Sequence, residues 1–318
     1  MTRVVFMGTP AFAVPSLDAL CDAGYEVVGV ITQPDRPAGR GNRLTACPVK
    51  QRALERGLDV YQFERIRRPE GVAQLEALAP DLVVTAAFGQ ILTQALLDIP
   101  KRGTVNVHAS LLPAHRGAAP INRAIMGGDS TTGVSIMLTD IGIDTGDVLA
   151  TRAVSIGDME TAGELTERLS VLGAELLVDT LPGYLDGSIQ PVKQDASRAS
   201  YEPMLDKAMG EIDWSRPADA IACQVRGLNP WPVAWTDMAE GRLKLYLARP
   251  ADAVSDAEPG TVIVSGPKAG LVVKCGEGAL EILELQAPNA RRMDAKAYLM
   301  GKRIDVGTRF GGERHERN

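Results

Sequence analysis

The sequence is poor in cysteine and histidine, and this scarcity excludes several kinds of site. None of its four cysteines forms a CxxC pair, so we expect neither a zinc site nor a disulfide framework. The cysteines are Cys21, Cys47, Cys223 and Cys275. Only three histidines are present, and we expect no metal ion to be bound. Scattered free thiols favour a reducing compartment, so the expected location is the cytoplasm.

Long apolar runs are also absent. No stretch of 18 apolar residues occurs, so we expect no membrane-spanning helix, and the N-terminal MTRVVFMGTP reads as a strand and a turn. The composition, 45% hydrophobic and 23% charged, is typical of soluble globular proteins. A net charge of −6 argues against a general affinity for nucleic acid. Any contact with a polyanion must therefore come from a local basic patch.

Two phosphate-binding motifs are missing as well. The first expected strand, residues 3–8, leads into GTPAF, which lacks the glycines of a GxGxxG dinucleotide-binding turn. No GxxxxGK followed by Ser or Thr occurs anywhere in the chain. These absences disfavour nicotinamide-dependent oxidoreductases and nucleoside triphosphatases.

What the sequence does contain is an alternation of short apolar runs with amphipathic segments. This βαβ rhythm predicts an α/β fold with an open, mostly parallel, Rossmann-like sheet and helices on both faces. A hairpin and one long helix, residues 161–187, follow. The strands are expected at 3–8, 26–32, 81–89, 103–110, 132–140 and 147–156, and the shorter helices at 15–24, 49–57, 71–80 and 121–129.

The later part of the chain has a different character. At 318 residues the chain is long enough for two domains. We expect the α/β domain at 1–188, a linker at 189–204 and a smaller C-terminal domain at 205–318. In that last part, short strands are broken by Gly, Pro and Asp, which predicts a small β-barrel resembling the oligonucleotide-binding fold.

Two polar residues stand out at the end of an apolar strand in VNVHASLLPAHRG, residues 105–117. Asn106 and His108 share one face because strand side chains alternate. Either residue alone has an equally plausible structural role. Together, at the carboxyl end of a parallel strand, they indicate a ligand site.

A third element is the acidic turn DIGIDTGD, residues 140–147. Asp and Gly are ordinary turn residues, and the spacing is not that of a calcium loop. A functional role requires one aspartate to lie opposite His108, across the end of the sheet. An Asn amide, an imidazole and a carboxylate would then suit the transfer of an acyl-type group. The amide donates to an oxyanion, the imidazole moves a proton and the carboxylate orients the ring. With no obvious Ser or Cys nucleophile, direct transfer between two bound substrates is expected.

These residues resemble a known family. Asn106-Val-His108, the run Ser110–Pro113, Arg116-Gly117 and the segment 143–147 are similar to the motifs of folate-dependent formyltransferases. Further segments resemble the members of that family that act on tRNA. They are FMGTPAF (6–12), TQPDRPAGRG (32–41), PVK (48–50), FGQIL (88–92), IDW (212–214) and NPWP (229–232).

The resemblance implies an activity and a set of site residues. The formyl donor would be 10-formyltetrahydrofolate, no metal would take part, and the acceptor would be the α-amino group of methionine on initiator tRNA, in translation initiation. The implied catalytic residues are Asn106, His108 and Asp144, and the implied folate-binding residues are Ser110, Leu111, Leu112, Pro113, Phe88, Gly89, Ile91 and Leu92.

The long basic loop at 32–50 is a candidate tRNA contact, with a solvated surface loop as the alternative. Its candidate residues are Arg36, Arg40, Arg43 and Lys50, and we expect Arg40 to be the main contact. Further backbone contacts are expected from the C-terminal domain. The candidates there are Arg291, Arg292, Lys296, Lys302 and Arg303.

Two other functions remain open at this point. One is a formyltransferase acting on a small amine, an amino sugar or glycinamide ribonucleotide; the basic loop argues against it. The other is a non-catalytic RNA-binding protein, which would be expected to have lost the Asn, His and Asp set. We expect folate and initiator methionyl-tRNA as partners, no membrane association, and a monomer.

Overall fold

The computed structural model of the chain describes residues 1–38 and 43–311. The chain divides into two compact units. The first comprises Met1–Pro120, Thr132–Val154 and Thr166–Glu202; the second comprises Ile121–Thr131, Ser155–Leu165 and the residues from Pro203 on. The first unit thus includes most of the segment expected to be a linker, and the domain limits given above stay predictions.

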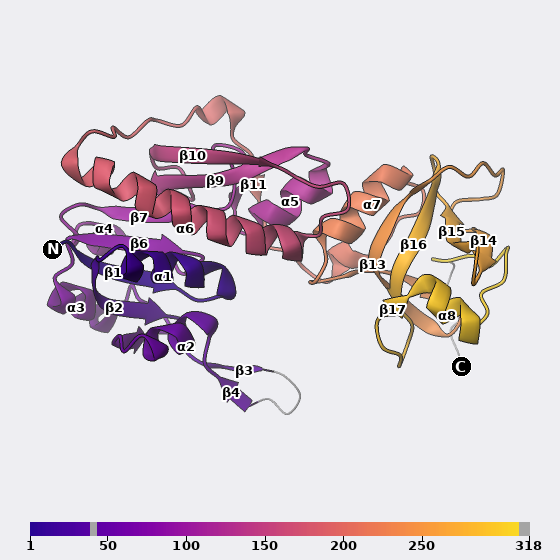
Figure 1. Cartoon of the computed structure of the whole chain (residues 1–318), viewed down its shortest axis with the longest axis horizontal. Coiled ribbons are helices and arrows are strands. Elements are labelled where there is room, and N and C mark those ends of the chain that lie inside the picture. Colours follow the sequence, from indigo (N-terminus) through magenta and orange to yellow (C-terminus); the bar gives the residue numbers. More distant parts are fainter. Residues whose placement is uncertain (39–42, 312–318) are drawn as a thin grey trace. The chain divides into compact units, whose positions relative to one another are not determined.

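A seven-stranded sheet forms the centre of the first unit (Figure 1). Its strand order is β10-β9-β7-β6-β1-β2-β5. The bounds are β1 Arg3–Gly8, β2 Glu26–Thr32, β5 Val60–Gln62, β6 Leu82–Ala86, β7 Thr104–His108, β9 Thr131–Leu138 and β10 Val148–Ser155. Neighbouring strands from β5 to β7 are parallel, whereas β9 is antiparallel to β7. The prediction of an open, mostly parallel sheet is therefore confirmed.

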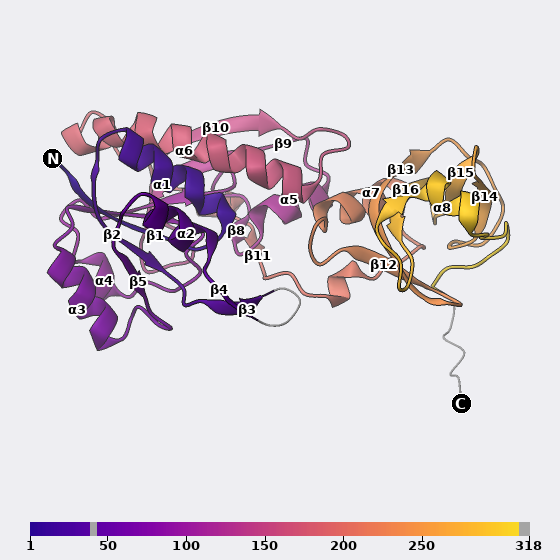
Figure 2. The ribbon, with the colours of Figure 1, turned by 60° about the horizontal axis from the view of Figure 1, so that its bottom comes forward.

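Helices cover both faces of this sheet, with α1 and α6 on one side and α3 and α4 on the other (Figures 1 and 2). Strand residues such as Val5 and Met7 pack with Leu75 of α3 and Leu96 of α4 in one buried cluster. The helix bounds are α1 Val14–Asp22, α2 Pro48–Glu55, α3 Pro69–Leu78, α4 Gln94–Leu97, α5 Pro120–Gly127 and α6 Ala162–Asp186, with a 3-10 turn η1 at Ala11–Ala13. Helices α1, α2 and α3 each have Pro in the first turn, where no intrahelical N–H is needed.

The long helix α6 begins with a reciprocal cap. The Glu164 carboxylate accepts from the Thr161 N–H at 2.9 Å, and the Thr161 hydroxyl accepts from the Glu164 N–H at 3.3 Å. Farther along α6, Gly173 lies close against β7, because a Cβ there would be 2.8 Å from the Val107 side chain. The helix is therefore in close contact with the face of β7 opposite to Asn106 and His108.

Three short pairings were not predicted, and one of them joins β5 to β2 at the edge of the seven-stranded sheet. Strands β3, Arg36–Ala38, and β4, Arg43–Thr45, form an antiparallel ribbon where the sequence predicts only a loop. Strands β8, Arg116–Gly117, and β11, Tyr201–Glu202, pair in parallel. Stretches this short carry too few residues for a periodic pattern to reveal them.

The second unit contains a six-stranded sheet, with the order β12-β13-β16-β15-β14 and β17 paired to β16. All its described pairings are antiparallel, as expected for a smaller β-domain. The strand bounds are β12 Ala234–Met238, β13 Gly241–Ala251, β14 Val262–Gly266, β15 Gly270–Lys274, β16 Ala279–Gln286 and β17 Met293–Asp294. The second unit also has the 3-10 turn η3 Ala208–Gly210, and another, η2 Ala196–Arg198, lies in the first unit.

Two helices of the second unit were not predicted from the sequence, α7 Ala218–Gly227 and α8 Ala295–Gly301. Their apolar faces are narrow and rich in alanine, which weakens the helical pattern; in α7, Ile221 and Val225 supply the large buried side chains. Within the described part of the chain, no helix combines the length and the apolar character needed to cross a membrane.

Candidate active site

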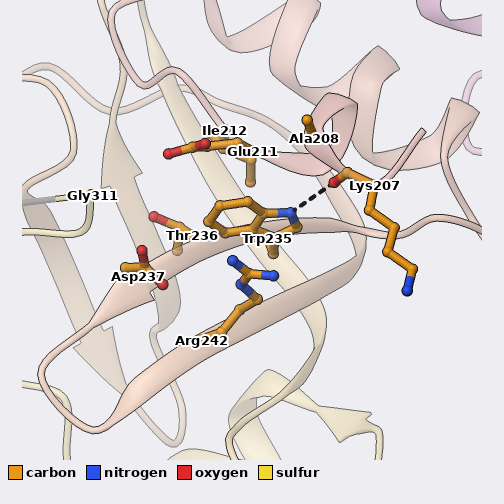
Figure 3. A pocket seen from close by; sticks show the side chains of 9 residues that line it. All are labelled: Lys207, Ala208, Glu211, Ile212, Trp235, Thr236, Asp237, Arg242 and Gly311. Carbon is orange, nitrogen blue, oxygen red and sulfur yellow. Dashed lines mark hydrogen bonds between the residues drawn. The ribbon is translucent and has the colours of Figure 1, made fainter. Parts of the chain in front are cut away.

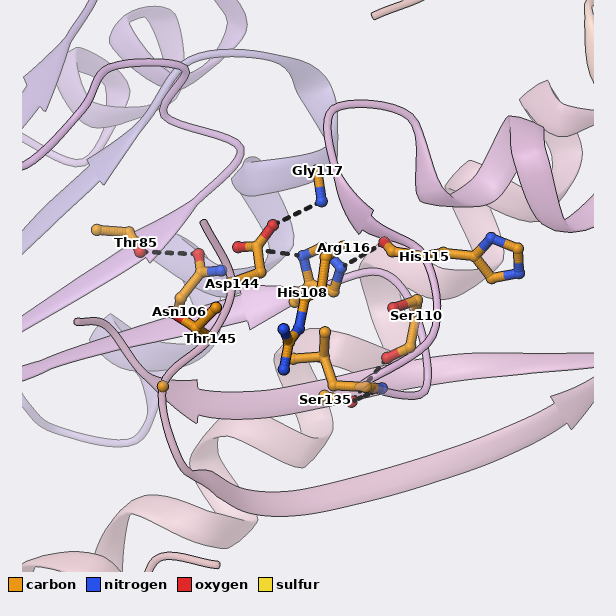
Figure 4. A network of polar contacts seen from close by, with 12 residues as sticks. Thr85, Asn106, His108, Ser110, His115, Arg116, Gly117, Ser135, Asp144 and Thr145 are labelled. Carbon is orange, nitrogen blue, oxygen red and sulfur yellow. Dashed lines mark hydrogen bonds and ion pairs between the residues drawn. The ribbon is translucent and has the colours of Figure 1, made fainter. Parts of the chain in front are cut away.

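The Asn106 amide has a defined orientation. It lies on β7 beside Thr85 of β6, and the Thr85 hydroxyl donates to Asn106 Oδ1 at 2.8 Å (Figure 4). Because Oδ1 accepts this bond, Nδ2 is left to donate to another group. The pair therefore holds an amide N–H in a position to bind a developing negative charge.

His108 ends β7 and is buried, with only 6% of its surface exposed. Its Nε2 lies 3.1 Å from the main-chain carbonyl of His115. A carbonyl only accepts, so Nε2 carries a proton, and in the neutral ring Nδ1 is the basic nitrogen. That Nδ1 lies 3.7 Å from Asp144 Oδ1 (Figure 4).

Opposing influences act on the pKa of His108, and burial is the largest. Desolvation disfavours the charged ring and lowers the pKa. The Asp144 carboxylate and the hydrogen bond to His115 raise it, and the charge of the His115 ring lowers it. The net direction is downward, so His108 is neutral at neutral pH and its basic nitrogen is free to take a proton.

Asp144 reaches His108 by an unexpected route. Strand β9 runs antiparallel to β7, so its last residue, Leu138, lies opposite Val105 near the beginning of β7. The loop that follows, residues 139–147, brings Asp144 Oδ1 to 3.7 Å from His108 Nδ1. An aspartate therefore does face His108, as expected, but its loop begins beside Thr104 at the start of β7 and not at the end that carries His108.

The loop around Asp144 has a constrained backbone. Asp144 has a φ of 52°, in the left-handed region. Its Oδ2 accepts from the Gly117 N–H at 2.9 Å. Asp140 supports the same loop by accepting from the Thr145 hydroxyl at 2.6 Å. Gly146 admits no side chain, because a Cβ would be 1.9 Å from the Leu138 carbonyl oxygen.

Two further residues near Asp144 were not predicted as site residues. The Gln194 amide donates to the main-chain carbonyls of Asp144, at 2.9 Å, and Gly146, at 2.7 Å. Its Oε1 accepts from Nε and Nη2 of Arg116, at 3.1 and 2.8 Å. From the sequence, Arg116 is only part of a motif, and Gln194 lies in the expected linker. No sequence pattern connects residue 194 with 144, so only the fold reveals the contact.

The expected folate-binding run holds its own loop in shape. Ser110 is fully buried, and its hydroxyl donates to the Ala114 carbonyl at 2.6 Å. The Ser135 hydroxyl donates to the Ser110 carbonyl at 2.7 Å and accepts from the Leu112 N–H at 3.0 Å. The side chains of Leu111, Leu112 and Pro113 are half-buried. Ser110 thus shapes the loop, while its three neighbours keep accessible surface.

The other expected folate-binding loop follows β6. Phe88 and Leu92 are buried in the core beside α3 and α4, whereas Ile91 is 68% exposed. Gly89, with a φ of 75°, sits against Gln33, whose amide donates to the Phe88 carbonyl at 3.1 Å. Of the four residues, Ile91 offers the largest free apolar surface.

Two of the described cations of the basic loop are held in ion pairs. Lys50 donates to Asp35 and Gln62 at 2.8 Å each, and Arg36 pairs with Glu64 at 2.9 Å. The Lys50 ammonium and Gln62 lower the pKa of Asp35. Arg43 on β4 is exposed. Arg40 lies outside the described residues.

The second unit carries exposed basic residues and a pocket. All five candidate cations there are exposed; Arg292 pairs with Glu284, and Arg303 with Asp305. A pocket of about 640 Å³ lies beside Trp235, over which the Arg242 guanidinium stacks 3.4 Å from the ring centroid (Figure 3). None of the predicted catalytic residues lines it. In the described ranges 1–38 and 43–311, no group of three or more His, Cys, Asp or Glu could hold a metal ion.

Comparison with known proteins identifies the chain. The formyl transferase model matches residues 2–181, and the model of the formyl transferase C-terminal domain matches residues 204–303. The chain belongs to the formyl transferase family. The resemblance found in the NVH and SLLP motifs is thereby confirmed.

Relatives of this formyl transferase extend along nearly its whole length. A protein of Symbiobacterium thermophilum named methionyl-tRNA formyltransferase is 50% identical over 311 residues, covering 98% of this chain and 95% of the relative. A protein of Bacillus licheniformis with the same name is 49% identical, covering 98% of both chains.

Solved structures share the fold of this formyl transferase at low identity. The sugar 3N-formyl transferase WlaRD has a TM-score of 0.66 at 17% identity, covering 92% of this chain and 99% of that one. HypX from Aquifex aeolicus, solved with tetrahydrofolic acid, has a TM-score of 0.61 at 16% identity, covering 96% of this chain and 50% of that one.

Proposed function

We propose that this formyl transferase moves the formyl group of 10-formyltetrahydrofolate to the α-amino group of methionine esterified to initiator tRNA. The observation that carries the proposal is the likeness, at about 50% identity over 98% of the chain, to bacterial proteins named methionyl-tRNA formyltransferase. The arrangement of Asn106, His108 and Asp144 supports the chemistry.

The reaction begins with attack of the free amine on the formyl carbon. The new C–N bond converts the carbonyl into a tetrahedral oxyanion, and the Asn106 Nδ2–H donates to that oxygen. This donor is aligned before the reaction, because Thr85 already holds the other end of the amide. A prealigned donor stabilises the intermediate more than the substrate.

The amine must lose a proton, and the folate nitrogen must gain one. Neutral His108 takes the proton at Nδ1, and the resulting imidazolium is stabilised by Asp144 at 3.7 Å. The imidazolium then returns the proton to the departing folate nitrogen as the tetrahedral intermediate collapses. The proton balance closes, and His108 regains its starting state.

The surroundings of the site suit a folate. Ile141 and Ile143 on the loop at 139–147 are 65% and 64% exposed, and Ile91 on the loop after β6 is 68% exposed. A flat heterocycle needs apolar surface and a few hydrogen-bonding groups. The exposed isoleucines provide the apolar surface, and the polar groups beside their loops provide the hydrogen bonds. We infer that Ile91 and residues 111–113 contact the donor, with Ser110, Phe88, Gly89 and Leu92 shaping its pocket.

The tRNA would be bound by the basic loop, with Arg40 and Arg43 as direct contacts. Arg36 and Lys50 begin from ion pairs, so each must leave a carboxylate to reach a phosphate. A cytoplasmic monomer is the proposed state, and the basic residues of the second unit add contacts to the tRNA backbone.

A formylation assay tests the proposal. Charged initiator tRNA and free amino sugars would be offered in parallel, with 10-formyltetrahydrofolate as donor and uncharged tRNA as the control. We expect rapid formylation of the charged tRNA alone. Preferential formylation of the sugars would reject the proposal in favour of a formyltransferase for small amines.

A further inference from the structure

We propose that Gln194 is a positioning residue for the reaction, and that its carboxamide, held by Arg116, fixes Asp144 against His108. The inference rests on the proposed function for its catalytic consequence. Its structural part concerns a contact between residues 50 positions apart in the sequence.

Gln194 uses its full hydrogen-bonding capacity. Nε2 has two protons, and it donates to two carbonyl oxygens, those of Asp144 and Gly146. Oε1 accepts two bonds from the guanidinium of Arg116. A flipped amide would place N–H against N–H and oxygen against oxygen, so only one orientation satisfies all four bonds.

Arg116 makes this orientation rigid. Its side chain is buried, with 3% of the residue exposed, and Nη1 donates to the Tyr201 hydroxyl at 2.8 Å. Hydrogen bonds from a cation are stronger than neutral ones, and they polarise the amide that accepts them. The Arg116 charge therefore strengthens the two bonds that Gln194 donates.

The same short stretch also holds the Asp144 carboxylate. Gly117, the residue after Arg116, donates its N–H to Oδ2, which leaves Oδ1 directed at His108. Gln194 thus fixes the backbone of Asp144 and Gly117 fixes its side chain. A residue with a φ of 52° needs such support, because the left-handed region is unfavourable for side chains with a Cβ.

The expected effect on the reaction follows from His108. Burial and the nearby His115 ring, which is paired with Glu202, oppose charge on His108, while Asp144 favours it. If Asp144 loses its fixed position, the imidazolium loses its stabilising partner, and His108 becomes a weaker base. Misplacement by about 1 Å can cost about 10²-fold in rate.

Two substitutions of Gln194 distinguish the role of its amide N–H donors from that of the rest of its side chain. Gln194→Met keeps the length and removes all four hydrogen bonds. Gln194→Glu keeps the acceptor for Arg116 but places an oxygen against the two carbonyls. The matched control is Gln190→Met, because Gln190 is an exposed glutamine of the same segment whose amide, among the residues that the structure describes, donates to the Gly187 carbonyl alone, at 2.7 Å.

The test combines kinetics with a titration that needs no turnover. We expect both variants at 194 to lower kcat by about 10-fold to 10²-fold, with a smaller change in KM for either substrate. In Gln194→Met, the NMR titration midpoint of the His108 ring should move to lower pH. In an Asp144→Asn background, Gln194→Met should reduce kcat by less than it does alone.

Normal kcat and an unmoved His108 titration in the folded variants would overturn the positioning role. A loss of thermal stability alone, with both quantities unchanged, would do the same. The titration also separates this inference from the proposed function. If His108 shifts while the wild-type protein fails to formylate charged tRNA, the positioning holds and the proposed function fails.

Discussion

The Thr85 hydroxyl donates to Asn106 Oδ1 at 2.8 Å, across the parallel pair of β6 and β7. A threonine that makes this bond decides which end of the amide faces the substrate. The catalytic use of Asn106 therefore depends on a neighbour that does not itself bind the transferred group.

Asn106→Ala should lower kcat by about 10²–10³-fold, the usual cost of removing one oxyanion donor. Thr85→Val should lower it less, because the amide remains but is free to rotate. The control is Thr132→Val, since Thr132 is a buried threonine of the same sheet whose hydroxyl has no hydrogen-bond partner among the described residues. Steady-state formylation rates measure all three, and a near-normal rate for Asn106→Ala would remove the oxyanion role.

The buried His108 should make stability depend on pH. Its pKa in the folded protein lies below the unfolded value of about 6.5, so the unfolded chain binds more protons as the pH falls through that value. The free energy of unfolding should therefore decrease between pH 7.5 and pH 5.5. His108→Gln should flatten this dependence in urea unfolding; parallel curves for the two proteins would contradict the assignment.

Gly117→Ala should damage both stability and activity. Gly117 has a φ of 109°, and a Cβ would lie 2.4 Å from the Glu202 carbonyl oxygen. Relieving that clash would separate β8 from β11 and move the N–H that binds Asp144. Gly24→Ala is the matched control, because Gly24 has a φ of 80° with no atom within 4 Å of a Cβ. We expect Gly24→Ala to cost about 1–2 kcal/mol of stability and to leave kcat unchanged. If Gly24→Ala and Gly117→Ala changed kcat equally, Gly117 would have no particular role in positioning Asp144.

Arg40→Ala and Arg43→Ala should weaken binding of charged tRNA without changing folate affinity. Each lost phosphate contact should reduce the slope of log K against log salt by about 0.7–0.9. Lys101→Ala is the control, since Lys101 is exposed and precedes the start of β7, the end of that strand opposite to His108. Filter-binding at several salt concentrations provides the measurement. If folate affinity falls in the arginine variants, the loop lies at the donor site instead.

Six strands of the seven-stranded sheet, all but β5, and the shared face of Asn106 and His108 could be predicted, because these strands leave apolar runs or a period of two. The family could be predicted because several motifs coincide in one chain. The route of Asp144 could not, since it depends on β9 running antiparallel to β7. Neither could the contact of Gln194 with the carbonyl of Asp144, which no local pattern encodes.

The histidines illustrate the same limit. His108 was predicted as a site residue, and the structure places it against Asp144. The ring of His115 pairs with Glu202 at 3.0 Å. The main-chain carbonyl of His115 nevertheless fixes the tautomer of His108, a contribution that every residue type can make and that sequence therefore conceals.

The segment after α6 sets a lower limit on the size of a working catalytic fragment. A protein cut after residue 188, at the expected end of the α/β domain, would retain Asn106, His108 and Asp144. It would lack Gln194, as well as Ser200 and Glu202, whose oxygens accept from the N–H groups of residues 115, 116 and 118. Excising the first unit as an independent enzyme therefore requires a chain that continues at least to Glu202.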